Sequence, residues 1–201
     1  MPEPMNTEQV LEVFRQCDAI LEGHFILSSG LHSPVFLQKA RVFMHPDKTE
    51  ILCTALAGKI RAAGLGRMDY CVGPAVGGII PAYETARQLG VPSIWVEREE
   101  GNFHLRRFEI AQGARLVVIE DIVTTGLSIR ETIACLKAAG GQVLAAACII
   151  DRSAGNSDVG VPLIALAKYQ IPAYSEAQMP PELAAIAATK PGSRHLGNNR
   201  R

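Results

Sequence analysis

The stretch LVVIEDIVTTGLS, residues 116–128, carries the side chains best suited to chemistry in this chain. Two adjacent acids follow an apolar run, and small residues follow the acids at the start of a helical pattern: Thr124, Thr125, Gly126, Leu127 and Ser128. Hydroxyl side chains and glycine at a helix start leave backbone N–H groups free to hold a phosphate, which the positive end of the helix also attracts. This segment is therefore a candidate phosphate site.

The two acids, Glu120 and Asp121, indicate the other end of the ligand. Carboxylates are poor phosphate ligands because like charges repel each other. They accept hydrogen bonds from a ribose diol, and they stabilise positive charge that develops on a sugar ring. The spacing predicts one ligand with a phosphate at one end and a diol at the other, a ribose 5-phosphate. The alternative is an acidic strand end followed by an ordinary Ser/Thr helix cap.

Two further loops follow apolar runs and carry groups suited to anions. Gly77 and Gly78 follow one such run, and glycines let a backbone approach a polyanion closely. A simple tight turn is the alternative for this pair. Arg152 follows another apolar run, and its planar guanidinium matches a carboxylate in bidentate fashion. The alternative for Arg152 is a surface arginine paired with Asp151 or Glu176.

The elements that must position these loops form an alternating pattern. Continuously apolar runs are expected to form five strands, at residues 69–73, 91–97, 115–119, 142–150 and 161–167. Helices are expected between them, one ending at Leu89 and one over residues 128–139, with another at 47–63 before the first strand. This alternation predicts an α/β fold with a mainly parallel sheet covered by helices on both faces. In such sheets ligands bind beyond the carboxyl ends of the strands, where the candidate loops begin.

The N-terminal third does not follow the alternation. A helix is expected over residues 7–21, with a capping box between Asn6 and Gln9. Two short strands joined by a Ser-Ser-Gly turn are expected in HFILSSG and SPVFLQKARVF. We therefore expect a single domain in three parts: a small hood over approximately 1–45, a core over approximately 46–170 and a C-terminal extension over 171–201.

Composition and charge exclude several classes of function. The chain has 201 residues, with 20 Lys and Arg against 20 Asp and Glu, so its formal net charge is zero. A neutral chain argues against a broad basic face, and we expect no nucleic-acid partner. The longest apolar run, Val143 to Ile150, is far shorter than the ~20 residues of a membrane helix, so we expect no membrane partner.

The cysteines and the start of the chain bear on its compartment. Five cysteines are widely spaced and form no CxxC pair. The first residues, MPEPMNTEQV, lack the basic and apolar regions of a secretory signal. We therefore expect a cytoplasmic protein whose cysteines pack as small apolar side chains. Neither GxxxxGK(S/T) nor a GxGxxG that opens a helix occurs, which weakens NTPase and dehydrogenase interpretations.

The motifs together resemble those of a known family. VVIEDIVTTGLS resembles the phosphoribosyl-pyrophosphate signature of the type I phosphoribosyltransferases. Three other segments are similar to those of the orotate phosphoribosyltransferases: FILSSGLHSP (25–34), CVGPAVGGIIPAYETARQLG (71–90) and IIDRSAG (149–155). They occur in the family's order and cover nearly the whole chain. The resemblance implies transfer of ribose 5-phosphate from 5-phosphoribosyl 1-pyrophosphate (PRPP) to orotate, which yields orotidine 5′-phosphate and pyrophosphate.

The resemblance also implies roles for particular residues. The PRPP-binding residues would be Arg98, Val76, Gly77, Glu120, Asp121, Ile122, Val123, Thr124, Thr125, Gly126, Leu127 and Ser128. Glu120 and Asp121 would be catalytic, and Thr124 and Arg152 would bind orotate. The family's pyrophosphate loop often carries a strained peptide, here expected at Ala75–Val76. Mg²⁺ is implied as a cofactor held mainly by PRPP and water, with no direct protein ligand assigned, and a homodimer is implied as the assembly.

The polar stretch 98–113 is expected to form a mobile hairpin that closes over the reaction and excludes water. It contains Arg98, His104, Arg106 and Arg107, where many members of the family have a longer, lysine-rich loop. Two alternative functions remain at this point. One is a phosphoribosyltransferase for another base, and the other is a non-catalytic regulator that binds PRPP.

Overall fold

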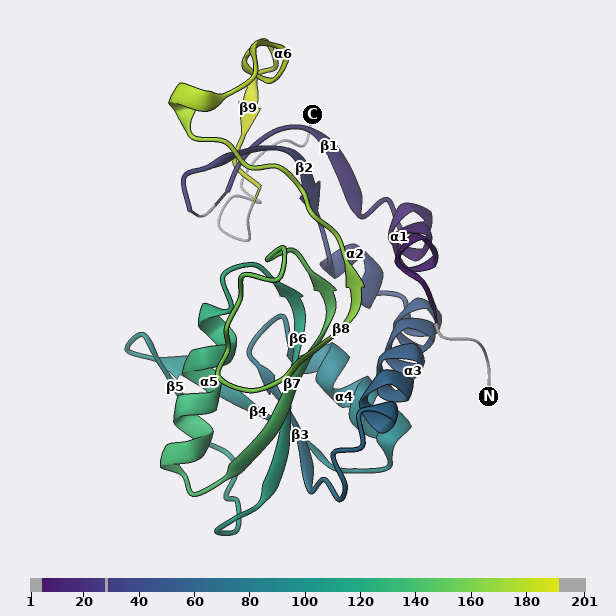
Figure 1. The fold of residues 1–201 in the computed structure, drawn as a ribbon, viewed down its shortest axis with the longest axis vertical. Coiled ribbons are helices and arrows are strands. Elements are labelled where there is room, and N and C mark those ends of the chain that lie inside the picture. The colour runs from purple at the N-terminus through teal and green to yellow at the C-terminus, as the bar shows by residue number, and fades with distance from the viewer. Residues whose placement is uncertain (1–4, 28, 192–201) are drawn as a thin grey trace, which may run out of the picture.

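The computed structural model describes residues 5–27 and 29–191, arranged as a large central sheet with a smaller sheet beyond one end of it (Figure 1). Ser28 of the expected Ser-Ser-Gly turn lies outside the described residues. So do residues 1–4 of the expected hood and 192–201 of the expected C-terminal extension. No helix within the described ranges is long and apolar enough to cross a membrane.

The central sheet has six strands in the order β5-β4-β3-β6-β7-β8. Their bounds are Tyr70–Pro74 (β3), Ser93–Glu99 (β4), Asn102–His104 (β5), Arg115–Val123 (β6), Gln142–Asp151 (β7) and Leu163–Lys168 (β8). The five expected strands are present and pair in parallel. The sixth, β5, pairs antiparallel with β4. The expected count of five omitted β5, because a strand of three residues within a polar stretch carries no apolar run.

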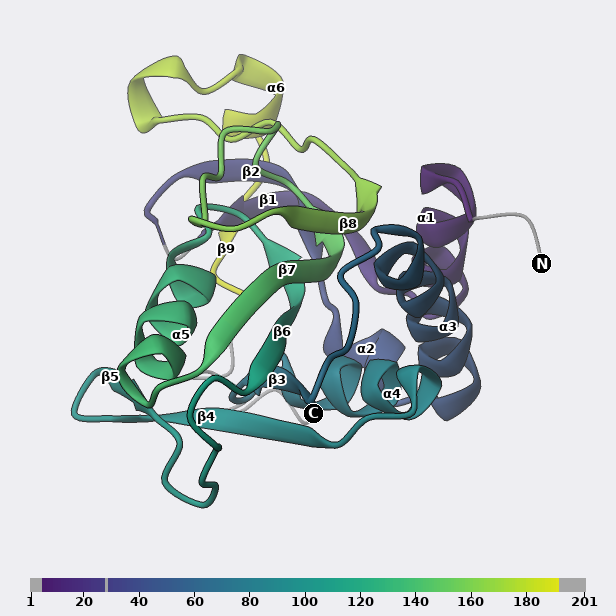
Figure 2. The ribbon, with the colours of Figure 1, turned by 60° about the horizontal axis from the view of Figure 1, so that its bottom comes forward.

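Helices cover both faces of this sheet, as the continuous apolar runs predicted (Figures 1 and 2). One face packs against α1 (Thr7–Gln16), α3 (Pro46–Ala62) and α4 (Ile79–Leu89), and the other against α5 (Leu127–Ala138). Along β6 the buried side chains alternate between two cores: Val117 and Ile119 face the first set of helices, and Leu116 and Val118 face α5. A strand buried on both faces must be apolar at every position.

The hood is a three-stranded sheet in the order β2-β1-β9. Its strands are β1 (Ile20–Ile26), β2 (His32–Leu37) and β9 (Ala188–Thr189). The last of these is contributed by the C-terminal segment, which pairs in parallel with β1 after the short helices η1 (Glu176–Gln178) and α6 (Pro181–Ala184). The hood expected over residues 1–45 therefore lacks one strand of the observed sheet, because that strand comes from a segment remote in sequence.

Two other expectations for the N-terminal third need correction. The capping box is present, with Asn6 and Gln9 each accepting the other's backbone N–H at 2.9 Å, but α1 ends at Gln16 instead of residue 21. Residues 20 and 21 belong to β1, where they pair with β2. The second strand stops at Leu37, and Ala40–Phe43 forms the short helix α2 because Val42 and Phe43 turn into the core.

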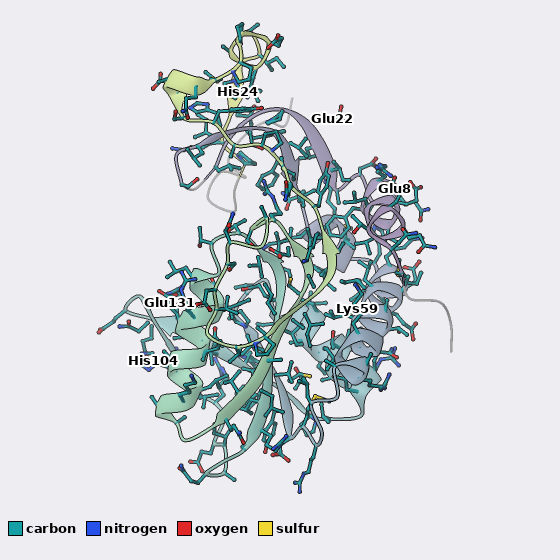
Figure 3. All side chains as sticks on the ribbon, in the orientation of Figure 1. Glu8, Glu22, His24, Lys59, His104 and Glu131 are labelled. Atoms are coloured by element: carbon teal, nitrogen blue, oxygen red, sulfur yellow. The ribbon has the colours of Figure 1, made fainter. Side chains whose placement is uncertain are left out.

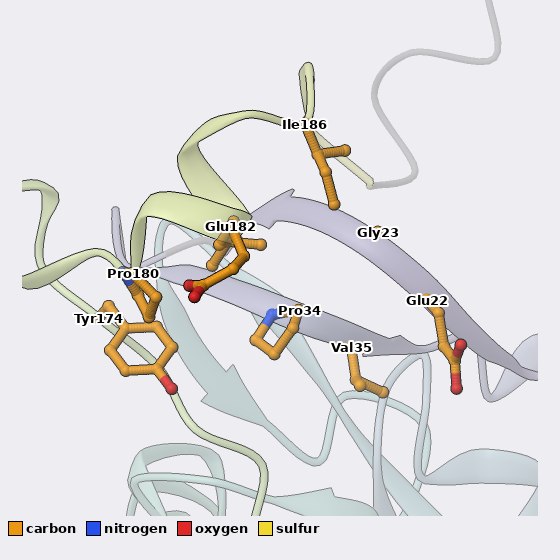
Figure 4. Close-up of a pocket in the computed structure, with 9 residues that line it drawn as sticks. Glu22, Gly23, Pro34, Val35, Tyr174, Pro180, Glu182 and Ile186 are labelled. Atoms are coloured by element: carbon orange, nitrogen blue, oxygen red, sulfur yellow. The ribbon is translucent and has the colours of Figure 1, made fainter.

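A pocket of about 370 Å³ lies between the hood strands and the C-terminal segment (Figure 4). Val35, Leu183 and Ile186 contribute apolar surface to it. None of its lining residues belongs to the loops that follow β3, β6 or β7. The pocket is a feature of the hood and does not include the candidate loops.

Candidate active site

The candidate loops meet where the strand order reverses. The chain passes from β3 to its neighbour β4 on one side and later places β6 on the other side of β3. A parallel sheet opens a ligand crevice beyond the carboxyl ends of the strands at such a point. The loops that begin at Ala75, Thr124 and Arg152 leave β3, β6 and β7 at this edge, and the Arg152 N–H donates to the Val123 carbonyl at 2.8 Å. The tertiary structure thus brings the three predicted loops together.

Glu120 and Asp121 lie within β6, which continues to Val123 instead of ending at residue 119. The pleat of a strand sends successive side chains to opposite faces, so the two carboxylates flank the strand. Glu120 is 8% exposed and Asp121 is fully buried. Burial, and then the neighbouring charge of Asp121, raise the pKa of the Glu120 carboxyl above its ordinary value. Two buried acids beside each other are costly and need a compensating positive charge.

Lys39 supplies such a charge to Asp121. It lies in the turn between β2 and α2, and its Nζ is 2.6 Å from Asp121 Oδ2. Lys39 was not predictable from the sequence, because a single lysine after a strand resembles any solvated surface residue. The contact exists only because the hood is folded against the end of β6.

The glycine loop after β3 packs directly onto β6 at Ile119 and Asp121. A Cβ atom at Gly77 would lie 2.2 Å from Asp121 Oδ2, and one at Gly78 would lie 2.9 Å from the Ile119 carbonyl oxygen. These approaches are too close for any side chain, so the glycines have a role beyond a tight turn. The Ala75–Val76 peptide bond is cis, at the position where the resemblance implied a strained peptide.

We expect Gly77→Ala to lower both stability and activity. The added methyl must displace the buried Asp121 carboxylate or its Lys39 partner, and overpacking of this kind costs about 1–3 kcal/mol. Thermal unfolding and steady-state kinetics on the same preparation measure the two effects. Gly58→Ala is the matched control, because Gly58 lies in α3 with open space around it and alanine favours a helix. Unchanged activity in Gly77→Ala would contradict the placement of this loop in the site.

The Thr/Gly segment after β6 opens α5 as predicted. The helix begins at Leu127, one residue before the expected start, and Gly126 precedes it with a φ of 73°. The residue before the helix is Gly126, so the helix has no side-chain N-cap at that position. Thr125 Oγ1, one residue earlier, accepts the Leu127 N–H at 3.3 Å, so the Ser/Thr cap alternative is present in part. Thr124 and Thr125 are exposed. Backbone N–H groups in the first turn of a helix have no intrahelical partner, which suits an anion.

A segment after β7 holds this loop in place. A Cβ atom at Gly126 would lie 2.2 Å from Ser157 Oγ, so the two segments touch. Arg130 Nη1 donates to the carbonyl oxygens of Thr125 and Asp158, at 2.9 and 3.1 Å. The sequence analysis did not identify Arg130, since its role depends on this contact between segments. The loop that would hold a phosphate is therefore fixed by the loop that carries Arg152.

Arg152 is a half-buried cation without an anionic partner among residues 5–27 and 29–191. Its Nε is buried and makes no hydrogen bond there, and burial lowers the pKa of its guanidinium. The alternative of a surface arginine paired with Asp151 or Glu176 is not observed, because no ion pair of the described chain includes Arg152. The Asp151 carboxylate accepts the Ser153 N–H at 2.8 Å instead. A half-buried guanidinium at a sheet's ligand edge, with no anionic partner in the described part of the chain, is suited to bind a carboxylate.

Arg98 lies in the β4–β5 hairpin, which ends at His104, so only the first part of the polar stretch 98–113 forms the expected hairpin. Its guanidinium lies 4.1 Å from the centre of the Phe103 ring and pairs with Glu131 of α5. In the described residues its polar contacts are with Gly101 and Glu131, and none is with the acids or the glycine loop. A contact between Arg98 and pyrophosphate, and closure of the hairpin, stay predictions.

The other basic residues of the stretch face the edge of the sheet. Arg107 Nε donates to Glu97 Oε1 at 2.8 Å, and Arg106 lies 3.8 Å from both Glu97 and Glu99. His104 is exposed on β5, close to α5 and far from the hood that carries His24 (Figure 3). The structure therefore does not bring these three residues to the acid pair.

A parallel sheet whose reversal point combines an acid pair, a glycine loop and a Thr/Gly helix start is the arrangement that the resemblance to the type I phosphoribosyltransferases implied. Residues 45–163 match the phosphoribosyl transferase domain family. The chain is 72% identical to orotate phosphoribosyltransferase 2 of Mesorhizobium japonicum and 70% identical to the orotate phosphoribosyltransferase of Brucella ovis. Each match covers 96% of this chain and 100% of the relative. The chain belongs to the orotate phosphoribosyltransferase family.

Solved structures agree on the fold. The orotate phosphoribosyltransferase of Aeropyrum pernix superposes with a TM-score of 0.66 at 27% identity, covering 79% of this chain and 93% of that one. An adenine phosphoribosyltransferase of Rhodothermus marinus has a TM-score of 0.60 at 19% identity, covering 81% and 99%. Since enzymes named for different bases share this fold, the choice of base must depend on local side chains.

Proposed function

We propose that this protein transfers the 5-phosphoribosyl group of PRPP to orotate and releases pyrophosphate, a step of pyrimidine (UMP) synthesis. The full-length relatives at 70–72% identity carry the name of this activity. The observation that carries the proposal is the half-buried guanidinium of Arg152, which has no anionic partner among residues 5–27 and 29–191. Orotate differs from uracil by a carboxylate, and Arg152 offers a partner for that group.

In this proposal PRPP spans the reversal point of the sheet. The backbone N–H groups of residues 124–128 hold its 5-phosphate, and Glu120 and Asp121 hold the ribose hydroxyls. The loop 75–78, with Arg98, binds the pyrophosphate. Contacts across the site support this arrangement, since Gly77 lies against Asp121 and Gly126 against the loop of Arg152.

The carboxylates also serve the chemical step. Displacement of pyrophosphate at C1 of the ribose passes through a state in which the ring carries positive charge. Asp121, paired with Lys39, presents negative charge, and a cationic ring or a bound cation would favour the ionised form of Glu120, whose pKa is raised in the ligand-free protein. The Asp121 N–H donates to Glu120 Oε1 at 3.1 Å and the Ile122 N–H to Asp121 Oδ1 at 2.5 Å. Charges that are already oriented need little reorganisation as the ring becomes cationic. Arg152 and Thr124 hold orotate on the other side of C1.

Mg²⁺ fits this donor set. The ion usually keeps several waters and binds through one or two carboxylates together with substrate phosphates. Two adjacent carboxylates at a phosphate site suit that mode, and a cage of three protein ligands is not required. When bound, Mg²⁺ neutralises charge on the pyrophosphate and ribose oxygens. Within this chain, Glu120 and Asp121 are the residues that would lie at the ion, which would be held mainly by PRPP and water.

The test of the proposal is ultraviolet loss of orotate with purified protein, PRPP and Mg²⁺. Uracil, nicotinate and hypoxanthine are run in parallel as competing bases. Orotate loss that requires both PRPP and Mg²⁺ is the expected result. Turnover of another base would support the proposed PRPP site but contradict the proposed role of Arg152 in binding orotate. PRPP binding without turnover of any base would indicate a non-catalytic regulator.

We further propose a homodimer whose interface includes the exposed apolar side chains of Val76, Ile80 and Tyr83. They are 84%, 49% and 65% exposed, and Ile80 and Tyr83 share a face of α4 beside the pyrophosphate loop. Exposed apolar side chains that gather on one face are typical of protein interfaces. We expect Ile80→Glu to be monomeric in light scattering, and Ile186→Glu, which changes a hood residue of equal exposure (48%), to remain dimeric. A dimeric Ile80→Glu would contradict this interface.

We propose that the protein is cytoplasmic. All five cysteines are free thiols, and four of them are buried, which suits the reducing cytoplasm.

We also propose that the hood, the core and the C-terminal segment form one catalytic domain. Lys39 of the hood contacts Asp121 of the core, and the C-terminal segment completes the hood sheet.

A further inference from the structure

Lys39 is the side chain by which the hood reaches the acid pair. Its Nζ lies 2.6 Å from Asp121 Oδ2, and the Asp121 carboxylate is fully buried, whereas the Lys39 side chain is 40% exposed. The ion pair is thus buried on the carboxylate side and open on the ammonium side. An ammonium has three donors, so the contact with Asp121 leaves others free.

The position of this ammonium relates it to the glycine loop. Lys39 Nζ lies 3.1 Å from the point that a Cβ atom of Gly77 would occupy. The loop itself, PAVGGI at residues 74–79, contains no cationic side chain. Lys39 therefore brings a positive charge to a loop that can otherwise offer an anion only backbone N–H groups.

A pyrophosphate group beside Asp121 needs such a charge. An uncompensated buried carboxylate would repel the polyanion, because charges interact strongly where water is excluded. Arg98, the other basic residue assigned to pyrophosphate, is engaged by Glu131 and Phe103 on the α5 side of the sheet. Among the described cations, Lys39 is the one that contacts Asp121.

We propose that Lys39 is a substrate-binding residue, whose ammonium contacts a pyrophosphate oxygen of PRPP while it remains paired with Asp121. This inference rests on the proposed function, because it takes the loop 75–78 as the pyrophosphate site. It gives the hood a direct part in PRPP binding, in addition to covering the ligand edge of the sheet.

The test compares Lys39→Met with Lys39→Arg. Calorimetric binding of Mg²⁺–PRPP and of Mg²⁺–pyrophosphate is measured together with the KM values for PRPP and orotate. We expect Lys39→Met to lower the affinity for both Mg²⁺–PRPP and Mg²⁺–pyrophosphate about 10- to 100-fold, the range for loss of a charge-assisted contact. The KM for orotate should change less than twofold, and Lys39→Arg should recover part of the PRPP affinity. Lys48→Met is the matched control, because Lys48 pairs at the surface with Gln16 and Asp47.

The outcomes separate this inference from the proposed function. A Lys39→Met protein that binds PRPP within twofold of the wild type would overturn the contact. Equal weakening of PRPP and orotate would also overturn it, since a general distortion of the site explains that pattern. If Lys39→Met does not fold, Lys39→Gln, which keeps a donor for Asp121, decides by the same readouts. A wild-type protein that binds PRPP but does not consume orotate contradicts the proposed function instead.

Discussion

Arg152→Ala is expected to lower kcat/KM for orotate by about 1.5 to 3.5 orders of magnitude, the loss of ~2–5 kcal/mol typical of removing one partner from a hydrogen-bonded charged pair. The guanidinium is half-buried and has no anionic partner among the described residues, so the orotate carboxylate is the partner it lacks. The KM for PRPP changes much less, because the variant leaves residues 120–128 intact. Initial rates over a matrix of orotate and PRPP concentrations measure both parameters.

The stability of the same variant distinguishes a ligand-binding arginine from a structural one. A buried charge without a partner costs folding free energy, so its removal should leave the melting temperature unchanged or raise it slightly. The variant Arg152→Lys keeps the charge but loses the planar fork, and we expect an intermediate kcat/KM. Arg107→Ala serves as the control, because Arg107 pairs with Glu97 at the sheet edge. Orotate use by Arg152→Ala at near wild-type efficiency would reject the proposed role.

Glu120→Gln is expected to lower kcat by about two orders of magnitude and to raise the stability of the ligand-free protein. The activity falls because an amide cannot stabilise positive charge on the ribose as a carboxylate does, and a well-placed electrostatic partner is worth ~3 kcal/mol in the transition state. The stability rises because Glu120 is buried beside Asp121, which makes its ionised form costly in the folded state. One substitution should therefore separate function from stability.

The sign of the pH dependence follows from the raised pKa of Glu120. Well below the ordinary carboxyl pKa the group is protonated in both the folded and the unfolded chain, and the substitution should change stability little. As the pH rises through the ordinary value toward the raised one, only the unfolded chain ionises freely, so the wild type loses stability. The gain in melting temperature for Glu120→Gln should grow over this window to about 2–4 °C.

Thermal unfolding of the wild type and Glu120→Gln at a series of pH values measures this difference. Glu109→Gln is the control, because Glu109 is exposed and its charge is solvated in both states. A melting-temperature gain that is the same at every pH would contradict the argument from burial. Retention of wild-type kcat by Glu120→Gln would reject the catalytic role of this carboxylate.

The amino-acid sequence by itself determined the sheet and the identity of the ligand loops. Strands that are buried on both faces must be apolar throughout, so five of the six strands of the central sheet were readable as apolar runs. The segment 116–128 could be predicted to bind a ribose 5-phosphate, because phosphate and ribose hydroxyls need different residue types in a fixed order. Arg152 could be predicted to lie at the ligand edge, because it follows the carboxyl end of a parallel strand.

Other features depend on contacts between remote segments, and only the tertiary structure decided them. The strand β9 pairs with β1, and His24 Nδ1 lies 2.8 Å from the Ile186 carbonyl oxygen, 162 residues away in the chain. Strand β9 has only two residues and pairs through its backbone groups, so its side chains show no apolar pattern. No local signal in the C-terminal segment therefore predicts that it completes the hood.

The same reason explains the side chains that the sequence analysis did not identify. Lys39 acquires its role from an ion pair with Asp121, and Arg130 from carbonyl oxygens on two loops. Arg98 is assigned to pyrophosphate through the family resemblance, and in the ligand-free structure its guanidinium contacts Glu131 and Phe103. A residue's type is set by the sequence, whereas its partner is set by how the hood, the hairpin and the sheet pack together. The chemistry of the site could thus be predicted from single loops, whereas the charged side chains around it depend on how those loops pack together.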